Sequence, residues 1–108
     1  YNIEQDDVHE FLAVMAQRRR MRIRDGAKQW SLLRDLEKPN TWTESYHLPT
    51  WIDYVRHSQR QTHADVEVAE HLDRLHRGDG PPVIHHMIER QTVPRHDDMP
   101  LKPYLDAT

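Results

Sequence analysis

The sequence predicts a single α+β domain whose elements follow the order β, α, β, β, α, β. Four short segments alternate apolar with polar residues, as half-buried strands do, and two longer regions repeat apolar residues at helical spacing. The 108 residues fit one domain and leave no room for two separate cores. Because 36% of the residues are hydrophobic and 31% are charged, we expect this domain to have a thin core.

The first strand is expected at residues 1–4, where Tyr1 and Ile3 alternate with polar side chains. A helix then begins after Asp6 or Asp7, since either carboxylate can cap the free amide groups of its first turn. The apolar positions of this helix recur at helical spacing and comprise Val8, Phe11, Leu12 and Met15.

The first helix should end at Asp25 and Gly26, because glycine permits the left-handed turn of a helix exit. Two alternating segments follow at residues 27–34 and 41–48, with a polar loop at residues 37–40 between them. They predict a β-hairpin. One face of its second strand carries Trp42, Glu44, Tyr46 and Leu48, of which all but Glu44 suit a core.

Two capping patterns mark the second helical region, Thr50 with Asp53 and Thr62 with Asp65. We therefore expect this region to be broken near residues 61–62. The apolar stripe of its second part consists of Val66, Ala69, Leu72 and Leu75, and the helix should stop at Gly78. A last strand is expected at residues 83–89, with Ile84 and Ile88 on one face and Val83 and Met87 on the other.

In this order the elements predict a ferredoxin-like fold, with a four-stranded antiparallel sheet and the helices on one face. Two such sheets can close face to face into a dimeric α+β barrel, so we expect a homodimer. The domain would span residues 1–90. Residues 91–108 contain three prolines among polar residues, which favours an extended tail.

Charge and composition argue against several classes of partner and site. The net charge is −3 with acidic and basic residues intermixed, which disfavours nucleic acid as a partner. Because cysteine is absent, disulfides and thiolate metal sites are excluded, in keeping with a reducing compartment. No apolar run reaches the roughly 18 residues of a membrane span, so we expect a soluble piece. The start at Tyr1, inside a strand and without an initiator Met, predicts a fragment of a longer chain.

A set of short motifs along the chain is similar to that of a known family. These motifs are Arg24-Asp25-Gly26-Ala27, Trp30, Asp35, Glu44, Trp51, residues 62–65 and His76-Arg77-Gly78. Over residues 1–89 the chain resembles the C-terminal soluble domain of the major facilitator transporters called transmembrane secretion effectors. This group includes enterobactin-exporter-like and nickel-resistance-like proteins.

The resemblance implies a non-catalytic domain of an efflux or secretion protein, held at the cytoplasmic side of the cell membrane behind the last membrane span. Its partners would be the membrane-spanning part of its own chain and a second copy of the domain. The implied role is regulation or dimerisation, without a cofactor, on a fold similar to the dimeric barrel of antibiotic-biosynthesis monooxygenases.

That fold similarity leaves a second hypothesis, a small cofactor-free monooxygenase or ligand-binding barrel. Its pocket would lie between sheet and helices and would be lined by Asn2, Trp30, Glu44, Tyr46, Trp51 and His57. The same aromatic residues suit a packed core, and we interpret them as core. We therefore assign no catalytic residue.

Glu44 is the least expected residue of the apolar strand face, because a buried carboxylate must be paired or protonated. We interpret it as one half of a structural ion pair rather than as a general base. The candidate partners are Arg24, Lys28 and Arg34.

Two further groups of charged residues have a simple and a functional interpretation. The basic run at the end of the first helix comprises Arg18, Arg19, Arg20 and Arg22. The simple interpretation is a solvated helix end, and the functional one is a weak contact with anionic lipid headgroups. The nine histidines raise the possibility of a metal site. However, His71 and His76 lie five residues apart, and His85 and His86 are adjacent on a strand, so neither pair shares a face. We therefore predict no metal ligands.

Overall fold

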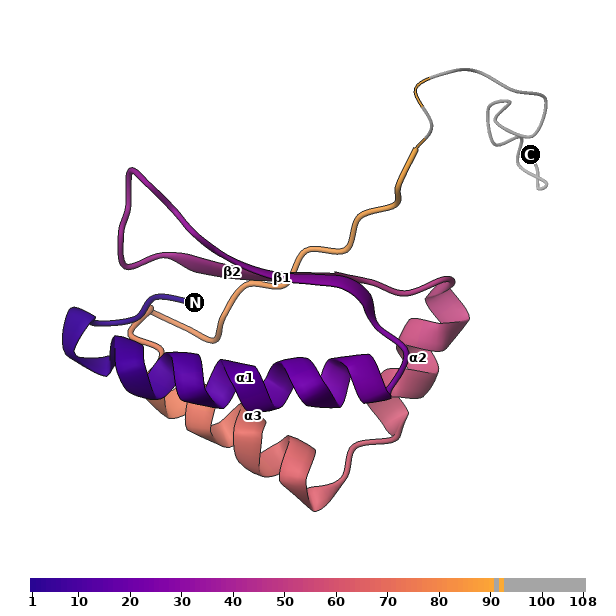
Figure 1. Ribbon diagram of the computed structural model, residues 1–108, viewed down its shortest axis with the longest axis horizontal. Coiled ribbons are helices and arrows are strands. Elements are labelled where there is room, and N and C mark those ends of the chain that lie inside the picture. The colour runs from indigo at the N-terminus through magenta and orange to yellow at the C-terminus, as the bar shows by residue number, and fades with distance from the viewer. Residues whose placement is uncertain (91, 93–108) are drawn as a thin grey trace.

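The computed structural model describes residues 1–90 and residue 92 as a mixed α+β protein with a two-stranded sheet (Figure 1). The tail predicted at residues 91–108 thus lies almost entirely outside the described residues. The elements in chain order are η1 (Gln5–Asp7), α1 (Val8–Arg24), β1 (Lys28–Arg34), β2 (Trp42–His47), α2 (Trp51–Gln59) and α3 (His63–Leu75). The break predicted near residues 61–62 separates α2 from α3.

Strands β1 and β2 pair antiparallel, which confirms the predicted hairpin. Leu32 lies directly opposite Glu44, so the two side chains share the face of the sheet that is turned toward α1. Between Lys28 and Ser31 the strand β1 has one residue more than β2, a β-bulge in which Gln29 takes the left-handed φ of 53°. The bulge ends the regular ladder next to Trp30.

At both ends of the domain full strands were predicted, and the described residues form none there. Residues 1–4 contribute one antiparallel bridge from Asn2 to Thr41 and one from Ile3 to His76. In residues 83–89 the structure has no strand, which corrects that part of the prediction. Among the described residues this segment has no neighbouring strand to pair with, and its four apolar side chains, Val83, Ile84, Met87 and Ile88, are 72–90% exposed. The described residues thus form two strands and two bridges rather than the expected four-stranded ferredoxin-like sheet.

The core lies between the sheet and the helices α1 and α3, which cover the same face of the sheet (Figure 1). Phe11 is fully buried at its centre, with its ring 5.5 Å from that of Tyr1 and 5.4 Å from that of Trp42. Burying a side chain of this size contributes about 2 kcal/mol. The other buried apolar residues in the described part of the chain are Ile3, Val14, Met15, Ala27, Trp42, Val68, Leu72 and Leu75.

The apolar stripes of both long helices are rotated relative to the prediction. Leu12 and Val66 were expected in the core, but they are 41% and 40% exposed. In their place Val14 and Val68 are buried. Each helix has apolar residues on two neighbouring faces, and the packing of α1 against α3 decides which of these faces is covered.

Trp51 also departs from the prediction that the aromatic residues form the core. It is the first residue of α2 and is 62% exposed, stacked on Tyr54 with ring centroids 4.9 Å apart. The helix α2 contains no buried residue at all. The core therefore ends at α1, α3 and the sheet, and α2 is attached to it from outside.

Candidate functional site

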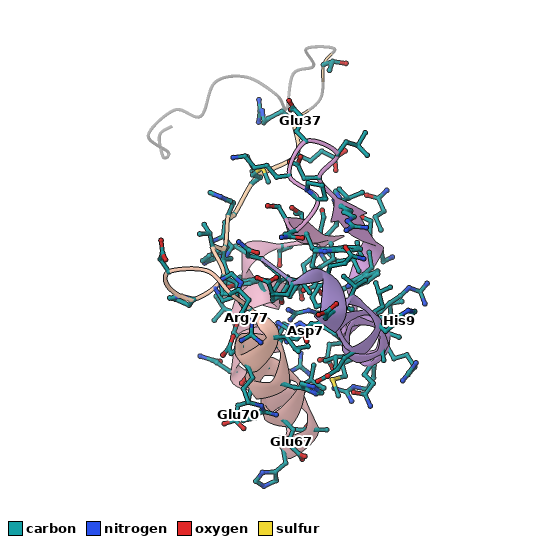
Figure 2. All side chains as sticks on the ribbon, turned by 90° about the vertical axis from the view of Figure 1, so that its left-hand side faces the viewer. Asp7, His9, Glu37, Glu67, Glu70 and Arg77 are labelled. Atoms are coloured by element: carbon teal, nitrogen blue, oxygen red, sulfur yellow. The ribbon has the colours of Figure 1, made fainter. Side chains whose placement is uncertain are left out.

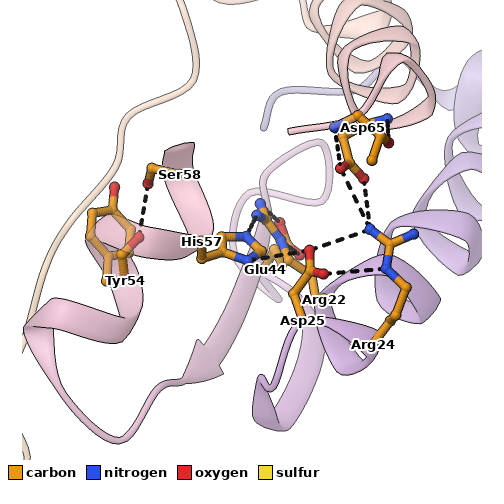
Figure 3. Close-up of polar contacts among 9 residues, drawn as sticks. Arg22, Arg24, Asp25, Glu44, Tyr54, His57, Ser58 and Asp65 are labelled. Carbon is orange, nitrogen blue, oxygen red and sulfur yellow. Dashed lines mark hydrogen bonds and ion pairs between the residues drawn. The ribbon is translucent and has the colours of Figure 1, made fainter. Parts of the chain in front are cut away.

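A polar cluster occupies the space between α1, the inner face of the sheet and α2. It is centred on Glu44 and is called the Glu44 cluster below. Its members are Arg18, Arg22, Trp30, Glu44, Tyr46 and His57, and Figure 3 shows part of it. The cluster continues the core toward α2, so that polar residues replace apolar ones at this end of the domain.

Glu44 accepts hydrogen bonds on both carboxylate oxygens. Arg22 reaches it with two nitrogens, Nε at 3.1 Å and Nη2 at 3.4 Å, while Arg18 Nε lies 3.3 Å away. The indole Nε1 of Trp30 donates to the same carboxylate at 2.8 Å. The Glu44 side chain is only 6% exposed, so this carboxylate is buried with two cations and a neutral donor around it.

These contacts keep Glu44 ionised. Burial alone would raise the pKa of the carboxyl group, because it penalises the charged form. The charge and hydrogen bonds of Arg22, the charge of Arg18 and the hydrogen bond of Trp30 outweigh this effect, and the pKa lies below its ordinary value. Glu44 is therefore a fixed negative charge at neutral pH.

The ion pair was predicted correctly, but its partners were not. The predicted partners Arg24 and Arg34 bind elsewhere: Arg24 contacts Asp25 and Asp65, and Arg34 Nε donates to the carbonyl of Pro39 at 2.6 Å. Lys28 lies at the bulge, opposite His47. The true partners Arg18 and Arg22 continue the buried face of α1, since they follow Phe11 and Met15 at helical spacing.

Tyr46 closes the cluster on the sheet side. The guanidinium carbon of Arg22 lies 4.6 Å from the centroid of its ring, a cation–π contact. Burial raises the pKa of the Tyr46 phenol above its ordinary value. Tyr46 therefore stays protonated at neutral pH, and its ring lies 6.3 Å from that of His57.

His57 joins α2 to the cluster through its imidazole ring. Its Nε2 lies 2.9 Å from Nη1 of Arg22, and because a guanidinium can only donate, Nε2 must accept. The proton of the neutral ring then sits on Nδ1, which is buried and 3.4 Å from Oδ2 of Asp25. Burial and the charge of Arg22 lower the pKa of His57 below 6.5, against the opposite effect of Asp25. His57 is thus neutral at neutral pH.

A second set of contacts connects the cluster to α3. Arg24 donates from Nε to Asp25 at 3.2 Å and from Nη2 to Asp65 at 3.4 Å (Figure 3). Asp65 also completes the capping box of α3, in which the Thr62 amide donates to its carboxylate at 2.9 Å. The predicted capping pattern is confirmed. Arg24 thereby ties the end of α1 to the start of α3.

A small pocket opens beside the cluster, between α1, α2 and α3. Its volume is about 50 Å³. A water molecule takes up about 30 Å³, whereas sites for drug-sized ligands have about 300–1,000 Å³. The pocket thus has the size of one or two water molecules. It is lined by Arg18, Met21, Arg22, Asp25, His57, Gln61, Asp65 and Ala69.

Of the six residues predicted to line a pocket, the structure brings four together: Trp30, Glu44, Tyr46 and His57. Asn2 lies at the bridge to Thr41, where its amide donates to Nδ1 of His76 at 2.9 Å. Trp51 lies on the outside of α2, with its ring 5.2 Å from that of His86. Arg18 and Arg22 complete the cluster, and their spacing from Phe11 is the signal that could have placed them there.

The histidines for which a metal site was considered are placed apart. His71 contacts Glu10, and Nδ1 of His76 accepts a hydrogen bond from the backbone amide of Asn2. Across the described part of the chain, no three His, Asp or Glu side chains come close enough to hold a metal ion.

The residues that carry the family resemblance have structural contacts. Gly26 takes a φ of +101° where α1 ends, and Ala27 is buried behind it. Asp35 Oδ1 accepts the amides of Glu37 and Lys38 at 2.8 and 2.9 Å and so shapes the hairpin loop. Arg77 pairs with Asp7 at 3.3 Å, and Figure 2 shows these two residues next to each other. These motif residues thus stabilise the end of α1, the hairpin loop and the contact between the two ends of the domain.

Fold and site define a small mixed α+β domain whose buried polar residues bind mainly one another. The family model of transmembrane secretion effectors matches residues 1–93, and the chain belongs to this family. The membership indicates a transporter-related protein of the major facilitator type. No curated protein and no solved structure match the chain. None of the helices in the described residues is both long and apolar enough to cross a membrane.

Proposed function

We propose that this chain is a non-catalytic domain of an efflux or secretion protein of the major facilitator type, held on the cytoplasmic side of the membrane. Its role would be regulation or assembly of the transporter. The family match over residues 1–93 supports the transporter setting. The observation that best supports a non-catalytic role is the Glu44 cluster, in which the carboxylate accepts four hydrogen bonds from two arginines and a tryptophan. Such a site holds elements together.

The same cluster argues against the monooxygenase-like alternative. A general base works best with a pKa near the working pH, whereas the pKa of Glu44 is lowered and that of Tyr46 is raised. The adjoining pocket of about 50 Å³ is far smaller than an aromatic substrate requires. A structural cluster fits both observations.

Pairing with a second copy is part of the proposal, through the outer face of the sheet. On this face Leu33 of β1 is 56% exposed. Val83 and Met87 of the extended segment after α3 are 78% and 90% exposed. Covering apolar side chains of this size is favourable, and two sheets packed face to face would form the α+β barrel expected from the sequence.

A contact with anionic lipid remains a proposal, now narrowed to two residues. Arg18 and Arg22 are bound to Glu44, and their side chains are only 19% and 16% exposed. Arg19 and Arg20 are exposed on α1. They are the arginines that could reach lipid headgroups.

The cytoplasmic placement can be tested in cells by cysteine labelling, because this chain has no cysteine of its own. In a full-length protein whose other cysteines are replaced, we introduce Leu36→Cys at the hairpin loop, where Leu36 is 96% exposed. A membrane-impermeant maleimide should label this site only after the cells are permeabilised. Val83→Cys, on another exposed segment, serves as the matched control. Labelling of both sites in intact cells would contradict the proposal.

A further inference from the structure

The helix α2 turns its polar side toward the domain and its apolar side away from it. His57 points inward, where its Nε2 contacts an arginine of the Glu44 cluster at 2.9 Å. Trp51, Ile52 and Val55 point away and are 62%, 60% and 36% exposed. A surface helix of a soluble domain has the opposite arrangement, with its apolar stripe on the core. The outward apolar face of α2 therefore indicates a partner surface.

The apolar face continues on the extended segment after α3. The ring of His86 lies 5.2 Å from that of Trp51 and 4.8 Å from that of Tyr54, so this segment passes beside α2. Ile84 and Ile88 lie two residues before and after His86 and are 72% and 77% exposed. In an extended chain, side chains two residues apart lie on the same side. The exposed apolar surface is thus wider than one helix.

Two arginines border the apolar face of α2. Arg56 and Arg60 follow Ile52 at intervals of four residues, which places them in the helical row next to the apolar one. Both are exposed, and within the described residues neither side chain has an ion pair or a hydrogen bond. The carboxylate of α2, Asp53, is occupied in the helix cap, where it accepts the hydroxyl of Thr50 at 2.8 Å. The border along α2 is therefore positively charged and complements an anionic partner.

We propose that the outer face of α2 is a docking surface for an anionic lipid bilayer, with Trp51, Ile52 and Val55 inserted at the level of the headgroups. Apolar side chains with a tryptophan and flanking arginines are typical of helices that lie in the plane of a membrane interface. A bilayer meets both parts of this face at once. Its acyl region takes up the apolar side chains, and its headgroups pair with Arg56 and Arg60.

This surface is different from the lipid contact proposed above for Arg19 and Arg20, which lie on α1 and would act through charge alone. It rests on the proposed function for its setting at a membrane, and it names the helix that the domain would turn toward the lipid. Purified protein and vesicles can test it without the transporter. A lack of vesicle binding would leave the cytoplasmic placement standing, and labelling of both cysteines in intact cells would leave vesicle binding standing.

The test mixes the 108-residue chain with vesicles of phosphatidylcholine, either alone or with phosphatidylglycerol, and separates bound protein by flotation. The chain should float with the vesicles that contain phosphatidylglycerol and much less with the others. Binding should shift the tryptophan emission to shorter wavelength. Trp51→Phe should abolish this shift, because Trp30 and Trp42 already lie inside the domain. A chain that does not float with anionic vesicles would overturn the proposal.

A matched pair of valine variants tests the apolar side chains. Val55→Asp places a charge on the apolar face and should weaken vesicle binding about tenfold, because one apolar side chain no longer enters the lipid. Val66→Asp is the control, since Val66 of α3 is 40% exposed and thus close to the 36% of Val55. It should bind vesicles as the unmodified chain does. Equal binding by Val55→Asp and Val66→Asp would contradict the proposed insertion.

Two arginine pairs decide which helix meets the lipid. Arg56→Gln combined with Arg60→Gln should weaken binding to anionic vesicles about thirtyfold, and Arg19→Gln combined with Arg20→Gln should weaken it less. The reverse order would place the contact on α1 and overturn the proposal. So would α2 variants that turn a dimer into a monomer without changing vesicle binding, since a second copy would then cover this face. All these changes are at exposed positions, and circular dichroism spectra verify that the variants fold.

Discussion

At the scale of single residues, Glu44 is the position where a charged residue type conflicts with a buried place in the fold. A carboxylate on the inner face of a sheet costs free energy unless its partners replace water completely. Here Arg22 binds it with two nitrogens, and Arg18 and Trp30 satisfy the remaining acceptor positions. The cluster can therefore replace apolar packing, but removing any one of its central side chains should destabilise the fold.

We predict that Glu44→Gln lowers the free energy of unfolding by about 3 kcal/mol, because it leaves two arginines beside a neutral side chain in a buried place. Equilibrium denaturation in urea measures this difference. Glu37→Gln changes an exposed residue of the hairpin loop and is the matched control, which should lower the free energy of unfolding only slightly. A loss as small for Glu44→Gln as for the control would show that the cluster does not stabilise the fold.

His57 makes the stability depend on pH. Its pKa in the folded protein lies below the value of 6.5 for the unfolded chain, so the unfolded chain binds the proton first as pH falls. The contribution of the neutral ring is fully present above pH 6.5 and decreases as pH falls toward the folded pKa. The charged and titratable groups around it are Arg18, Arg22, Asp25, Tyr46 and Asp65.

We therefore expect His57→Gln to reduce the loss of thermal stability between pH 7.5 and the acidic side of 6.5. Melting curves recorded over this range by circular dichroism provide the measurement. His63→Gln changes an exposed histidine at the start of α3 and should leave the pH profile as it is. An unchanged profile in His57→Gln would mean that another group controls the acid response.

At the scale of elements, the sequence predicted best where local signals decide. The first helix, the hairpin and the two capped helices follow from apolar spacing, glycine and threonine–aspartate pairs, and all are present in the structure. The strand predicted at residues 83–89 is absent from the structure, because alternation shows only that a segment suits a strand. Whether it becomes one depends on a neighbour, and the described residues supply none there.

The start of α3 offers a test at this scale. Thr62 accepts the amide of Asp65 at 3.2 Å, and Asp65 in turn binds Arg24 from α1. Thr62→Ala should lower the stability by about 1 kcal/mol, the usual effect of losing an N-cap. Thr62→Ser keeps the capping oxygen and should restore most of it. Thermal unfolding of both variants and of the unmodified chain measures this effect. If Thr62→Ala and Thr62→Ser melt at the same temperature, the cap does not stabilise the protein.

At the scale of the whole molecule, the candidate site was predicted in part. Glu44 could be recognised as a paired carboxylate from its place on an apolar strand face. Its partners depend on how α1 is rotated about its axis, which the packing of Phe11 and Met15 fixes. Trp51 was expected in the core, and no local pattern reveals that α2 lies outside it.

The proposed pairing of two copies through the sheet belongs to this scale as well. In sedimentation experiments at micromolar concentration we expect a dimer for the unmodified chain and a monomer for Leu33→Asp, which places a charge on the outer face. Ile52→Asp changes a side chain of similar exposure on α2 and should leave the dimer intact. A monomer for the unmodified chain would remove the proposed interface.

The lack of any buried residue in α2 has a consequence for how the protein opens. Local unfolding proceeds most easily where few apolar contacts must be broken. The helix α2 is connected to the rest mainly through the imidazole of His57, which in its neutral form accepts a hydrogen bond from Arg22. Mild acid should therefore release α2 as a separate unit while the hairpin and α1 remain folded, and this step would be visible as early amide exchange confined to residues 51–59.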